Sequence, residues 1–494
     1  MDTPANPFSI GQVTLLPWQE EAYPALLSVV QRVGAGLDAS DMGTGKSYTG
    51  AFVANAMRDG RCILVICPKA VIPSWKGIFR AMGLGEEEFF VTNYENARDR
   101  KGIPGIISVD PDGKYRFNKT RVGFIIFDEA HNIRSYEGTK NSKLAIGSKL
   151  AGVPHLYLSA TMADSPAHFR AVGFSLGLHQ GVDFFGWALK LGCTYDPWGK
   201  MVLKAGERVA VTRKLNAMLF PAYGIRVRKQ DIPNFPECEI HAEAFDFGDS
   251  KGIERVYAEM AEELAKLEEK IEADENRVKE RAKAMVAQLR ARQKVELLKI
   301  PGTVGLVEDA IEEGMAVALF TNFNSTINEM LKKCKHLKPA VIRGSQSEAA
   351  REKERLRFQN GETHFILVNA QSGGAGLGLH DINGIRPRLG FVYPCYSPVI
   401  MRQVTGRLPR AGSKSKSMYK FLFASGTVET KVLRKVQGKL NDMDRINDAD
   451  LLLDGEVPID TRVAEGYEPE EGEGGNTTTH LDAEMEDASS LGFF

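Results

Sequence analysis

The stretch ASDMGTGKS, residues 39–47, combines residue types that bind a phosphate chain. The Walker A pattern is G-x-x-x-x-G-K-[ST], and Ser40 stands where that pattern has its first glycine. Gly43 and Gly45 are present at the positions where backbone N–H groups approach phosphate most closely, so we expect the loop to function without that glycine. The expected nucleotide contacts come from Met42, Gly43, Thr44, Gly45, Lys46 and Ser47.

Two carboxylates supply the second part of this chemistry. The apolar run FIIFDEAH ends in Asp128 and Glu129, and burying two carboxylates without a metal would be costly. Asp128 is expected to hold the shell of an Mg²⁺ ion together with Ser47, and Glu129 to polarise an attacking water. Lys46 would reach the β- and γ-phosphates. ATP and Mg²⁺ are therefore the predicted cofactors of an ATP-hydrolysing site.

Such a site needs a parallel sheet, and the sequence predicts two of them. Short apolar runs separated by amphipathic or polar stretches are typical of buried parallel strands joined by crossover helices. Runs of this kind lie at 62–68, 122–130 and 155–161, and again at 315–323, 338–344, 363–370 and 388–394. The predicted fold class is α/β, with two parallel-sheet domains in tandem.

A helical segment is expected between the two domains. Residues 254–300 contain neither Gly nor Pro and are rich in Ala, Glu, Lys and Leu, which favours long helix. Residues 166–250 follow no clear pattern. The expected domains are a first lobe at 1–165, a helical insertion at 166–305, a second lobe at 306–445 and a C-terminal extension at 446–494.

The net charge of −1 conceals an acidic end. Nine acidic residues and no Lys or Arg follow Arg462, so the body before it is modestly basic and permits polyanion binding; a solvated mixed surface explains that charge nearly as well. From 464 onward the Gly-, Glu- and Thr-rich composition predicts disorder. The tail ends in Phe493 and Phe494, and it could dock on a protein partner, shield a basic groove or have no partner.

Composition also indicates in which cellular compartment the protein resides. The chain has 43% apolar residues, no run of about 18 of them to span a bilayer, and no signal-peptide pattern. Its six cysteines are scattered without a C-x-x-C pair, so neither a zinc site nor a disulfide framework is predicted. We expect a cytoplasmic protein without membrane contact.

The chain also carries an ordered series of motifs that resembles the superfamily 2 helicases. Asp128 to His131 spell the DEAH box of that family. Between residues 12 and 440 the other motifs follow in family order: LLPWQEEA, VICPKAVIPSW, VTNYENA, LSAT, ALFTNF, SGGAGLGL and QVTGRLPRAG. The resemblance implies two RecA-like lobes of the P-loop NTPase class, with a helical insertion between them.

Within the superfamily, the details are most similar to the Swi2/Snf2 group of double-stranded DNA translocases. CPKAVIPSW is close to that group's C-P-x-x-[LV]-x-x-x-W, and YSPVIMRQVTGRLPRAG to its N-P-x-x-x-x-Q-x-x-G-R-x-x-R-x-G. The chain departs from the group in three places. SDMGTGKS replaces D-E-M-G-L-G-K-T, LSAT is the general helicase form, and Pro409 and Ser413 replace the usual His and Gln of the last motif.

The resemblance implies nucleotide contacts beyond the phosphate loop. Gln19 would read adenine, and Gly376 would contact the nucleotide. Arg407 and Arg410 belong to the second lobe, so they would reach the γ-phosphate only when the lobes close. An arginine finger supplied in this way contributes ~10³ to 10⁵ in rate, and lobe closure would therefore gate hydrolysis.

Nucleic-acid contacts and coupling are implied in the same way. Phosphate contacts would come from Lys69, Trp75, Tyr94, Thr321 and Ser372, and coupling between hydrolysis and nucleic acid from His131, Ser159 and Thr161. For Trp75 and Tyr94, packing in the core is an equally good interpretation. Phosphate contacts carry no sequence information, so binding should be salt-sensitive and sequence-independent.

These observations predict a monomeric, DNA-dependent ATPase that translocates on duplex DNA and remodels forks, junctions or bound proteins. The first alternative is a strand-separating helicase that acts on single-stranded DNA or on RNA, because DEAH and SAT motifs occur there too. A scaffold with an inactive ATP site is a second alternative, and a motor subunit of a nuclease complex is a third. The complete set of Lys46, Asp128, Glu129, Arg407 and Arg410 argues against the scaffold.

Overall fold

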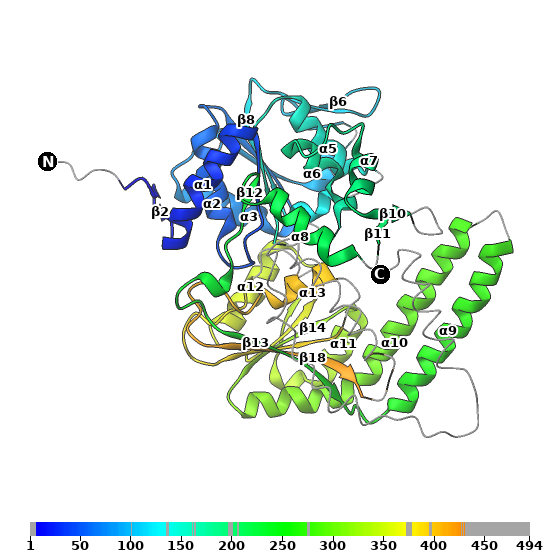
Figure 1. Cartoon of the computed structure of the whole chain (residues 1–494). Coiled ribbons are helices and arrows are strands. Elements are labelled where there is room, and N and C mark those ends of the chain that lie inside the picture. Colours follow the sequence, from blue (N-terminus) through cyan, green and yellow to red (C-terminus); the bar gives the residue numbers. More distant parts are fainter. Residues whose placement is uncertain are drawn as a thin grey trace. The chain divides into compact units, whose positions relative to one another are not determined.

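The computed structural model describes residues 6–99, 101–134, 138–160, 162, 165–195, 201–204, 207–273, 277–371, 378–394, 398–425, 427 and 429. The chain divides into two compact units between Phe235 and Pro236 (Figure 1). The acidic tail with Phe493 and Phe494, and the site candidates Thr161, Ser372 and Gly376, lie outside the described residues. None of the described helices combines the length and apolar composition needed to cross a bilayer.

The first unit is built on a six-stranded parallel sheet with the strand order β12-β3-β9-β8-β4-β5. In that order the strands are Gly224–Ile225, Ala35–Asp38, His155–Leu158, Val122–Asp128, Cys62–Cys67 and Phe89–Asn93. The central strands β4 and β8 are buried along nearly their whole length, which explains their uninterrupted apolar sequences. The three apolar runs of the first half therefore contain β4, β8 and β9, as predicted.

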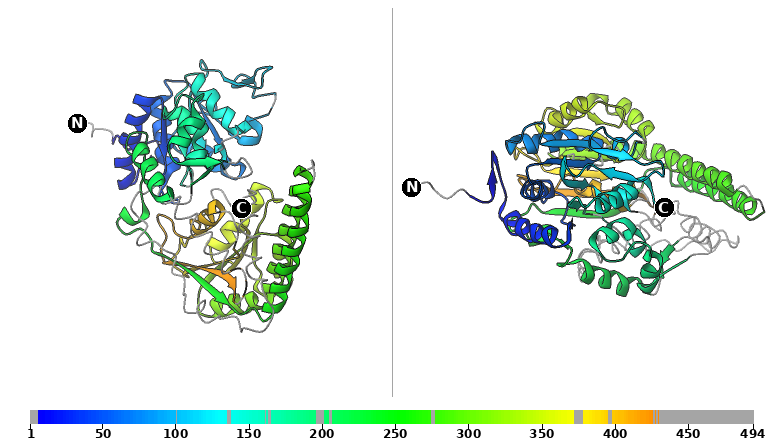
Figure 2. Two further views of the ribbon diagram at one scale, coloured as in Figure 1. Left: turned by 45° about the vertical axis from the view of Figure 1, so that its right-hand side comes forward. Right: turned by 90° about the horizontal axis from the view of Figure 1, so that it is seen from above.

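Helices and short hairpins surround this sheet and can be followed in Figure 2. The helices are α1 (Pro17–Val33), α2 (Lys46–Met57), α3 (Ile72–Ala81), α4 (Tyr94–Ala97), α5 (Lys140–Leu150), α6 (Arg170–Leu176), α7 (Phe184–Lys190) and α8 (Arg208–Leu219). The hairpins pair β1 (Ser9–Ile10) with β2 (Val13–Thr14), β6 (Ile107–Val109) with β7 (Tyr115–Phe117), and β10 (Cys193–Tyr195) with β11 (Met201–Leu203). Sheet residues such as Ile125 and Phe127 form one core with Leu144 of α5 and Val172 of α6.

Residues 166–235 belong to the first unit, so the unit extends beyond the expected boundary at 165. Its edge strand β12 lies beside β3, where the backbone N–H groups of Leu37 and Ala39 donate to the carbonyls of Tyr223 and Ile225 at 3.0 Å. A two-residue strand held by backbone hydrogen bonds leaves no apolar run, which is why the sequence pattern did not reveal it.

The second unit repeats the architecture with a parallel sheet of six strands in the order β13-β18-β17-β14-β16-β15. In that order the strands are Cys238–Phe245, Ser417–Ala424, Arg388–Val392, Ala316–Thr321, Phe365–Asn369 and Ala340–Ile342. The helices α11 (Asn324–Lys333), α12 (Glu348–Gln359) and α13 (Pro398–Thr405) connect them. Two parallel six-stranded sheets in tandem confirm the predicted fold class.

The charged segment lies between β13 and β14 of the second sheet and forms two helices, α9 (Ser250–Ala273) and α10 (Arg277–Glu312). They lie side by side and extend away from the second sheet (Figure 1). The expected boundary between residues 305 and 306 falls inside α10. Val307 and Ala310 of this helix share a core with Val317 and Leu319 of β14, so the end of α10 is part of the second unit and not of an insertion.

Candidate active site

The site residues gather at one edge of the first sheet. Because its strands are parallel, their carboxyl ends meet there, which is where ligands bind in open α/β sheets. Asp38 ends β3 and Asp128 ends β8, with β9 between the two strands. The phosphate loop follows β3 directly, and α2 begins at Lys46.

Two glycines give the loop its shape. Gly43 and Gly45 have φ angles of 87° and 88°, in the left-handed region that other residues avoid. A Cβ at Gly45 would also collide with the side-chain amide of Gln19. The backbone of this turn leads into the N-terminus of α2, an arrangement that suits an anion.

Ser40, in place of the missing glycine, has a bonding role of its own. It is buried, its backbone N–H donates to Asp38 Oδ1 at 2.9 Å, and its Oγ accepts the N–H of Val227 at 2.9 Å. The serine therefore ties the loop to the segment after β12, a bond that glycine could not form. Its side chain explains how the altered pattern is accommodated.

The next residue, Asp41, is held by the same segment. The Arg226 guanidinium contacts Asp41 Oδ1 at 3.0 Å and donates to the carbonyl of Ala39 at 2.5 Å. The backbone N–H of Lys229 donates to Asp41 Oδ2 at 2.9 Å. These hydrogen bonds and this ion pair were not predicted, because contacts between residues so far apart in the chain produce no local sequence signal.

Lys46 lies among carboxylates. Its Nζ donates to the carbonyls of Ser40 and Asp41 at 2.7 and 2.9 Å. Burial lowers the pKa of Lys46, while the charges of Asp38, Glu129, Asp41 and Asp128 oppose that change. Burial also disfavours the charged form of Asp38 and therefore raises its pKa, whereas the charge of Lys46 lowers it. The single ammonium is thus outnumbered by acidic groups at the point where phosphate would bind.

Asp128 is fixed at both carboxylate oxygens. Oδ1 accepts the backbone N–H of Glu129 at 2.9 Å, and Oδ2 accepts Nε1–H of Trp75 at 2.8 Å. Burial, and next the charge of Glu129, raise the pKa of Asp128 to about 6. The carboxylates of Asp128 and Glu129 and the hydroxyl of Ser47 are oxygen ligands of the kind that Mg²⁺ prefers. Because the two negative charges lie close together, a cation is favoured beside them. The residues therefore fit Mg²⁺.

Glu129 connects the site to the next motif. It has a φ of 49°, unusual for a residue other than glycine, and this aims the chain into the 3₁₀ turn Ala130–Ile133. Its Oε2 lies 3.3 Å from Nδ1 of His131, which in turn is 3.5 Å from Oγ of Ser159. The structure thus brings together the two described residues expected to couple the site, His131 and Ser159.

The expected nucleic-acid contacts separate into two groups. Lys69 is exposed on the 3₁₀ turn Lys69–Val71 after β4, where a phosphate backbone could reach it. Trp75, Tyr94 and Thr321 are buried at 1%, 3% and 0% exposure, which does not suit direct contact with a phosphate backbone. Tyr94 instead donates from its hydroxyl to the carbonyl of Asp128 at 2.9 Å, so core packing describes Trp75 and Tyr94 better.

The glutamine expected to read adenine is part of the loop's support. Gln19 is buried, its Nε2 donates to the carbonyl of Gly45 at 2.9 Å, and its Oε1 accepts the N–H of Leu16 at 2.8 Å. The neighbouring Trp18 donates from Nε1 to the carbonyl of Thr44 at 2.9 Å. Beside these residues lies a cavity of about 520 Å³, lined by Trp18, Glu21, Phe220, Ile225, Arg226 and Ile232.

The second unit carries the two arginines of the last motif. The carbonyl of Arg407 accepts the N–H of Leu379 at 3.0 Å, and the Arg407 side chain is buried. Arg410 is half-buried near His380. Burial, followed by the charge of Arg410, lowers the pKa of His380 to about 4, so the cationic character of this corner comes from the arginines.

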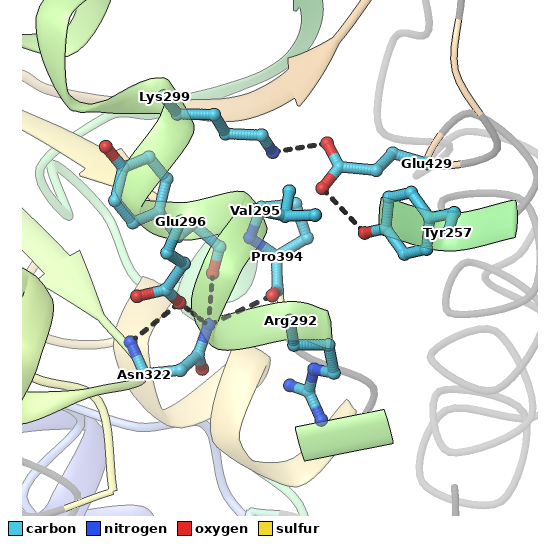
Figure 3. A pocket seen from close by; sticks show the side chains of 9 residues that line it. Tyr257, Arg292, Val295, Glu296, Lys299, Asn322, Pro394 and Glu429 are labelled. Carbon is cyan, nitrogen blue, oxygen red and sulfur yellow. Dashed lines mark hydrogen bonds and ion pairs between the residues drawn. The ribbon is translucent and has the colours of Figure 1, made fainter. Parts of the chain in front are cut away.

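A separate polar cluster is buried in the second unit (Figure 3). Lys299 of α10 forms an ion pair with Glu429, and the hydroxyl of Tyr257 donates to the same carboxylate at 3.0 Å. Glu296 accepts the N–H of Asn322 at 3.0 Å and the hydroxyl of Thr326 at 2.7 Å. The cavity between them measures about 20 Å³, enough for a water but not for a nucleotide.

Comparison with known proteins supports the division into two lobes. The family described as "Type III restriction enzyme, res subunit" matches residues 12–164, and "Helicase conserved C-terminal domain" matches residues 302–412. The "Putative ATP-dependent RNA helicase L364" of Acanthamoeba polyphaga mimivirus is 29% identical over 470 residues, which cover 88% of this chain and 84% of that protein.

DNA repair proteins match over shorter stretches. "DNA repair and recombination protein RAD54" of Saccharomyces cerevisiae is 27% identical over 130 residues, 25% of this chain and 14% of that protein. Among solved structures, "Sulfolobus solfataricus SWI2/SNF2 ATPase core in complex with dsDNA" is 19% identical with a TM-score of 0.36, covering 91% of this chain and 96% of that one. The DEAH residues at one sheet edge, the family match on each lobe and these relatives together make this chain similar to the superfamily 2 helicases and ATPases, including proteins of the Swi2/Snf2 family.

Proposed function

We propose that the protein is an ATP-hydrolysing motor that moves along duplex DNA and remodels forks, junctions or bound proteins. The observation that carries the proposal is the group formed by Lys46, Asp128 and Glu129 behind the glycine loop of the first lobe. Arg407 and Arg410 of the second lobe would add positive charge at the γ-phosphate to that of Lys46.

In the proposed mechanism, each residue at the sheet edge has one task. Backbone N–H groups from Gly43 to Ser47 hold the phosphates, and Lys46 exchanges its carbonyl partners for the β- and γ-phosphate oxygens. Ser47 and Asp128 would hold Mg²⁺, whose chemistry at this place is to neutralise charge on the phosphate oxygens. Glu129 orients the attacking water, and His131 relays the state of the site to Ser159.

The adenosine end of ATP has a candidate place in the cavity beside Trp18. A volume of about 520 Å³ falls in the range of pockets for small ligands, and the walls combine aromatic and aliphatic groups with Glu21, Arg226 and Asp231. Gln19 would then support adenine binding indirectly, by fixing the phosphate loop, since its Nε2 already donates to the carbonyl of Gly45.

Conversion of hydrolysis into movement requires the two lobes to differ in their grip on DNA between cycles. Arg407 and Arg410 would complete the hydrolysis site only in the closed state, and this contribution is ~10³ to 10⁵ in rate. Lys69 is the described candidate on the first lobe that is exposed to a phosphate backbone. Because phosphate contacts dominate, the affinity for DNA should fall with salt and vary little with sequence.

A strand-separating helicase is the second candidate. The relative that matches most of this chain is named as an RNA helicase, and the LSAT sequence is the general helicase form. The two candidates differ in the polymer that accelerates ATP turnover.

The test is steady-state ATP hydrolysis with duplex DNA, forked DNA, single-stranded DNA and RNA in parallel. We expect the greatest stimulation with duplex or forked DNA. Greatest stimulation by RNA would favour the second candidate, and no stimulation by any polymer would remove the motor. The Lys46→Ala variant controls for contaminating ATPases and should be inactive throughout.

A further inference from the structure

We infer that Trp75 is a positioning residue of the hydrolysis site, whose indole N–H holds the Asp128 carboxylate in the orientation that Mg²⁺ requires. This inference rests on the proposed ATPase function. Trp75 lies on α3, and Asp128 is the last residue of β8, so Trp75 and Asp128 meet only because the sheet places β4 beside β8. Neither the motifs nor the comparisons assign this task to the tryptophan.

The geometry fixes Asp128 at three points. Trp75 Nε1 donates to Oδ2 at 2.8 Å, the Glu129 N–H donates to Oδ1 at 2.9 Å, and the Tyr94 hydroxyl donates to the Asp128 carbonyl at 2.9 Å. The carboxylate group therefore cannot rotate freely about its Cβ–Cγ bond. A carboxylate oxygen has two acceptor positions, so each still has capacity to hold the metal shell.

The indole itself is held rigidly. Trp75 is 1% exposed, and its ring lies 5.7 Å from that of Phe79, which stacks on Phe89 at 5.2 Å between ring centroids. Phe79 is on the same helix and Phe89 starts β5, so helix and sheet both fix the ring. A donor that cannot move sets the direction of its hydrogen bond.

The chemistry of the donor also matters. Indole Nε1–H donates one hydrogen bond and carries no charge. It can orient Asp128 without neutralising it, whereas a Lys or Arg at this place would compete with the cation. Metal-binding groups are commonly oriented by such outer partners, whose loss costs about 10–100-fold in metal affinity or activity.

The test compares Trp75→Phe, which removes the N–H and keeps an aromatic ring, with Trp187→Phe as the matched control. Trp187 is a partly buried tryptophan of the same unit that packs on His179 and Phe184. The equilibrium affinity for a non-hydrolysable ATP analogue is measured in Mg²⁺ and in EDTA, together with kcat and KM for ATP.

For Trp75→Phe we expect an unchanged affinity in EDTA, a loss of about 10–100-fold in the affinity gained from Mg²⁺, and a similar fall in kcat. Trp187→Phe should match the native protein. Native Mg²⁺ dependence in Trp75→Phe would overturn the inference, as would an equal loss of affinity in Mg²⁺ and EDTA. If the native protein neither hydrolyses ATP nor gains affinity from Mg²⁺, the proposed function fails instead.

A spectroscopic measurement decides the case if Trp75→Phe does not fold. The chain has four tryptophans, so protein labelled with ¹⁵N-tryptophan gives four indole N–H signals. We expect one of them to move both in the Asp128→Ala variant and when Mg²⁺ is added to the native protein with ADP. If no signal responds to both changes, the indole does not hold the carboxylate and the inference is wrong.

Discussion

The two lobes share one architecture but use their buried charges differently. In the first, Lys46 is surrounded by Asp38, Asp41, Asp128 and Glu129 beside a glycine loop and a cavity of about 520 Å³. In the second, Lys299 is paired with Glu429, and the remaining space is about 20 Å³.

This contrast separates a binding site from a structural polar cluster. Glu296 illustrates the second kind: burial raises its pKa, and the hydrogen bonds from Thr326 and Asn322 oppose that change. Its carboxylate is thus satisfied by neutral donors within the fold. Buried acids therefore indicate a cation site only where they exceed the positive charge beside them, as they do around Lys46.

The largest effect should come from removing Arg410, which we propose stabilises the γ-phosphate in the transition state. Arg410→Ala is expected to lower kcat for DNA-stimulated hydrolysis by ~10³ to 10⁵, with nucleotide binding little changed, because an arginine finger acts on the transition state. Stopped-flow or steady-state ATPase assays measure this. Arg343→Ala, which removes a half-buried arginine bonded to Asn328, is the matched control. Equal loss in both variants would contradict the assignment.

The structural cluster of the second lobe should respond in stability. Lys299→Met leaves Glu429 buried without its cation, which costs about 3–5 kcal/mol of the free energy of unfolding. Lys294→Met on the same helix breaks only an exposed pair with Glu259, at 3.8 Å, and should cost at most about 1 kcal/mol. Urea unfolding measures both. A Lys299→Met variant as stable as the native protein would show that the cluster does not hold the lobe together.

A smaller effect on the free energy of unfolding is expected when the pH is lowered, and it comes from His155 in the first lobe. His155 is fully buried, its Nδ1 bonds to the carbonyl of Val153 at 2.8 Å, and burial lowers its pKa to about 4. The folded state therefore binds fewer protons than the unfolded state. The stability contributed by neutral His155 is present above pH 6.5 and is lost as the pH falls towards 4, by up to about 3 kcal/mol.

The measurement for His155 is urea unfolding between pH 7 and pH 4.5 in the native protein and in His155→Phe. Phe remains neutral and keeps an aromatic ring against Phe127 and Tyr157, so the variant should show a shallower loss of stability with acid. Identical pH dependence in the two proteins would exclude His155 as a cause of acid sensitivity.

The fold could be predicted, and the candidate site residues could be identified, because their signals are local. The strands β4 and β8 are buried along nearly their whole length and read as apolar runs, and the glycines of the loop are required by their positive φ angles. Lys46, Asp128 and Glu129 follow from patterns a few residues long.

What could not be predicted depends on contacts between distant segments. The bonds of Ser40 and Asp41 to Val227 and Arg226 arise from β12, a strand of two residues with no periodicity. The position of Trp75 was open between core and nucleic acid, and only the neighbouring β8 decides that its N–H faces Asp128. The packing of the end of α10 on the second core is likewise a contact between distant segments that no local pattern shows.

The central claim, that only the first lobe's carboxylates perform the chemistry, is tested by one pair of matched substitutions. Glu129→Gln and Glu296→Gln each replace a carboxylate by its amide, and the kcat of ATP hydrolysis with duplex DNA is measured for both. We expect Glu129→Gln to lose ~10²- to 10⁴-fold, the typical contribution of a general base, while Glu296→Gln retains native turnover. Native turnover in Glu129→Gln, or an equal loss in Glu296→Gln, would contradict the account.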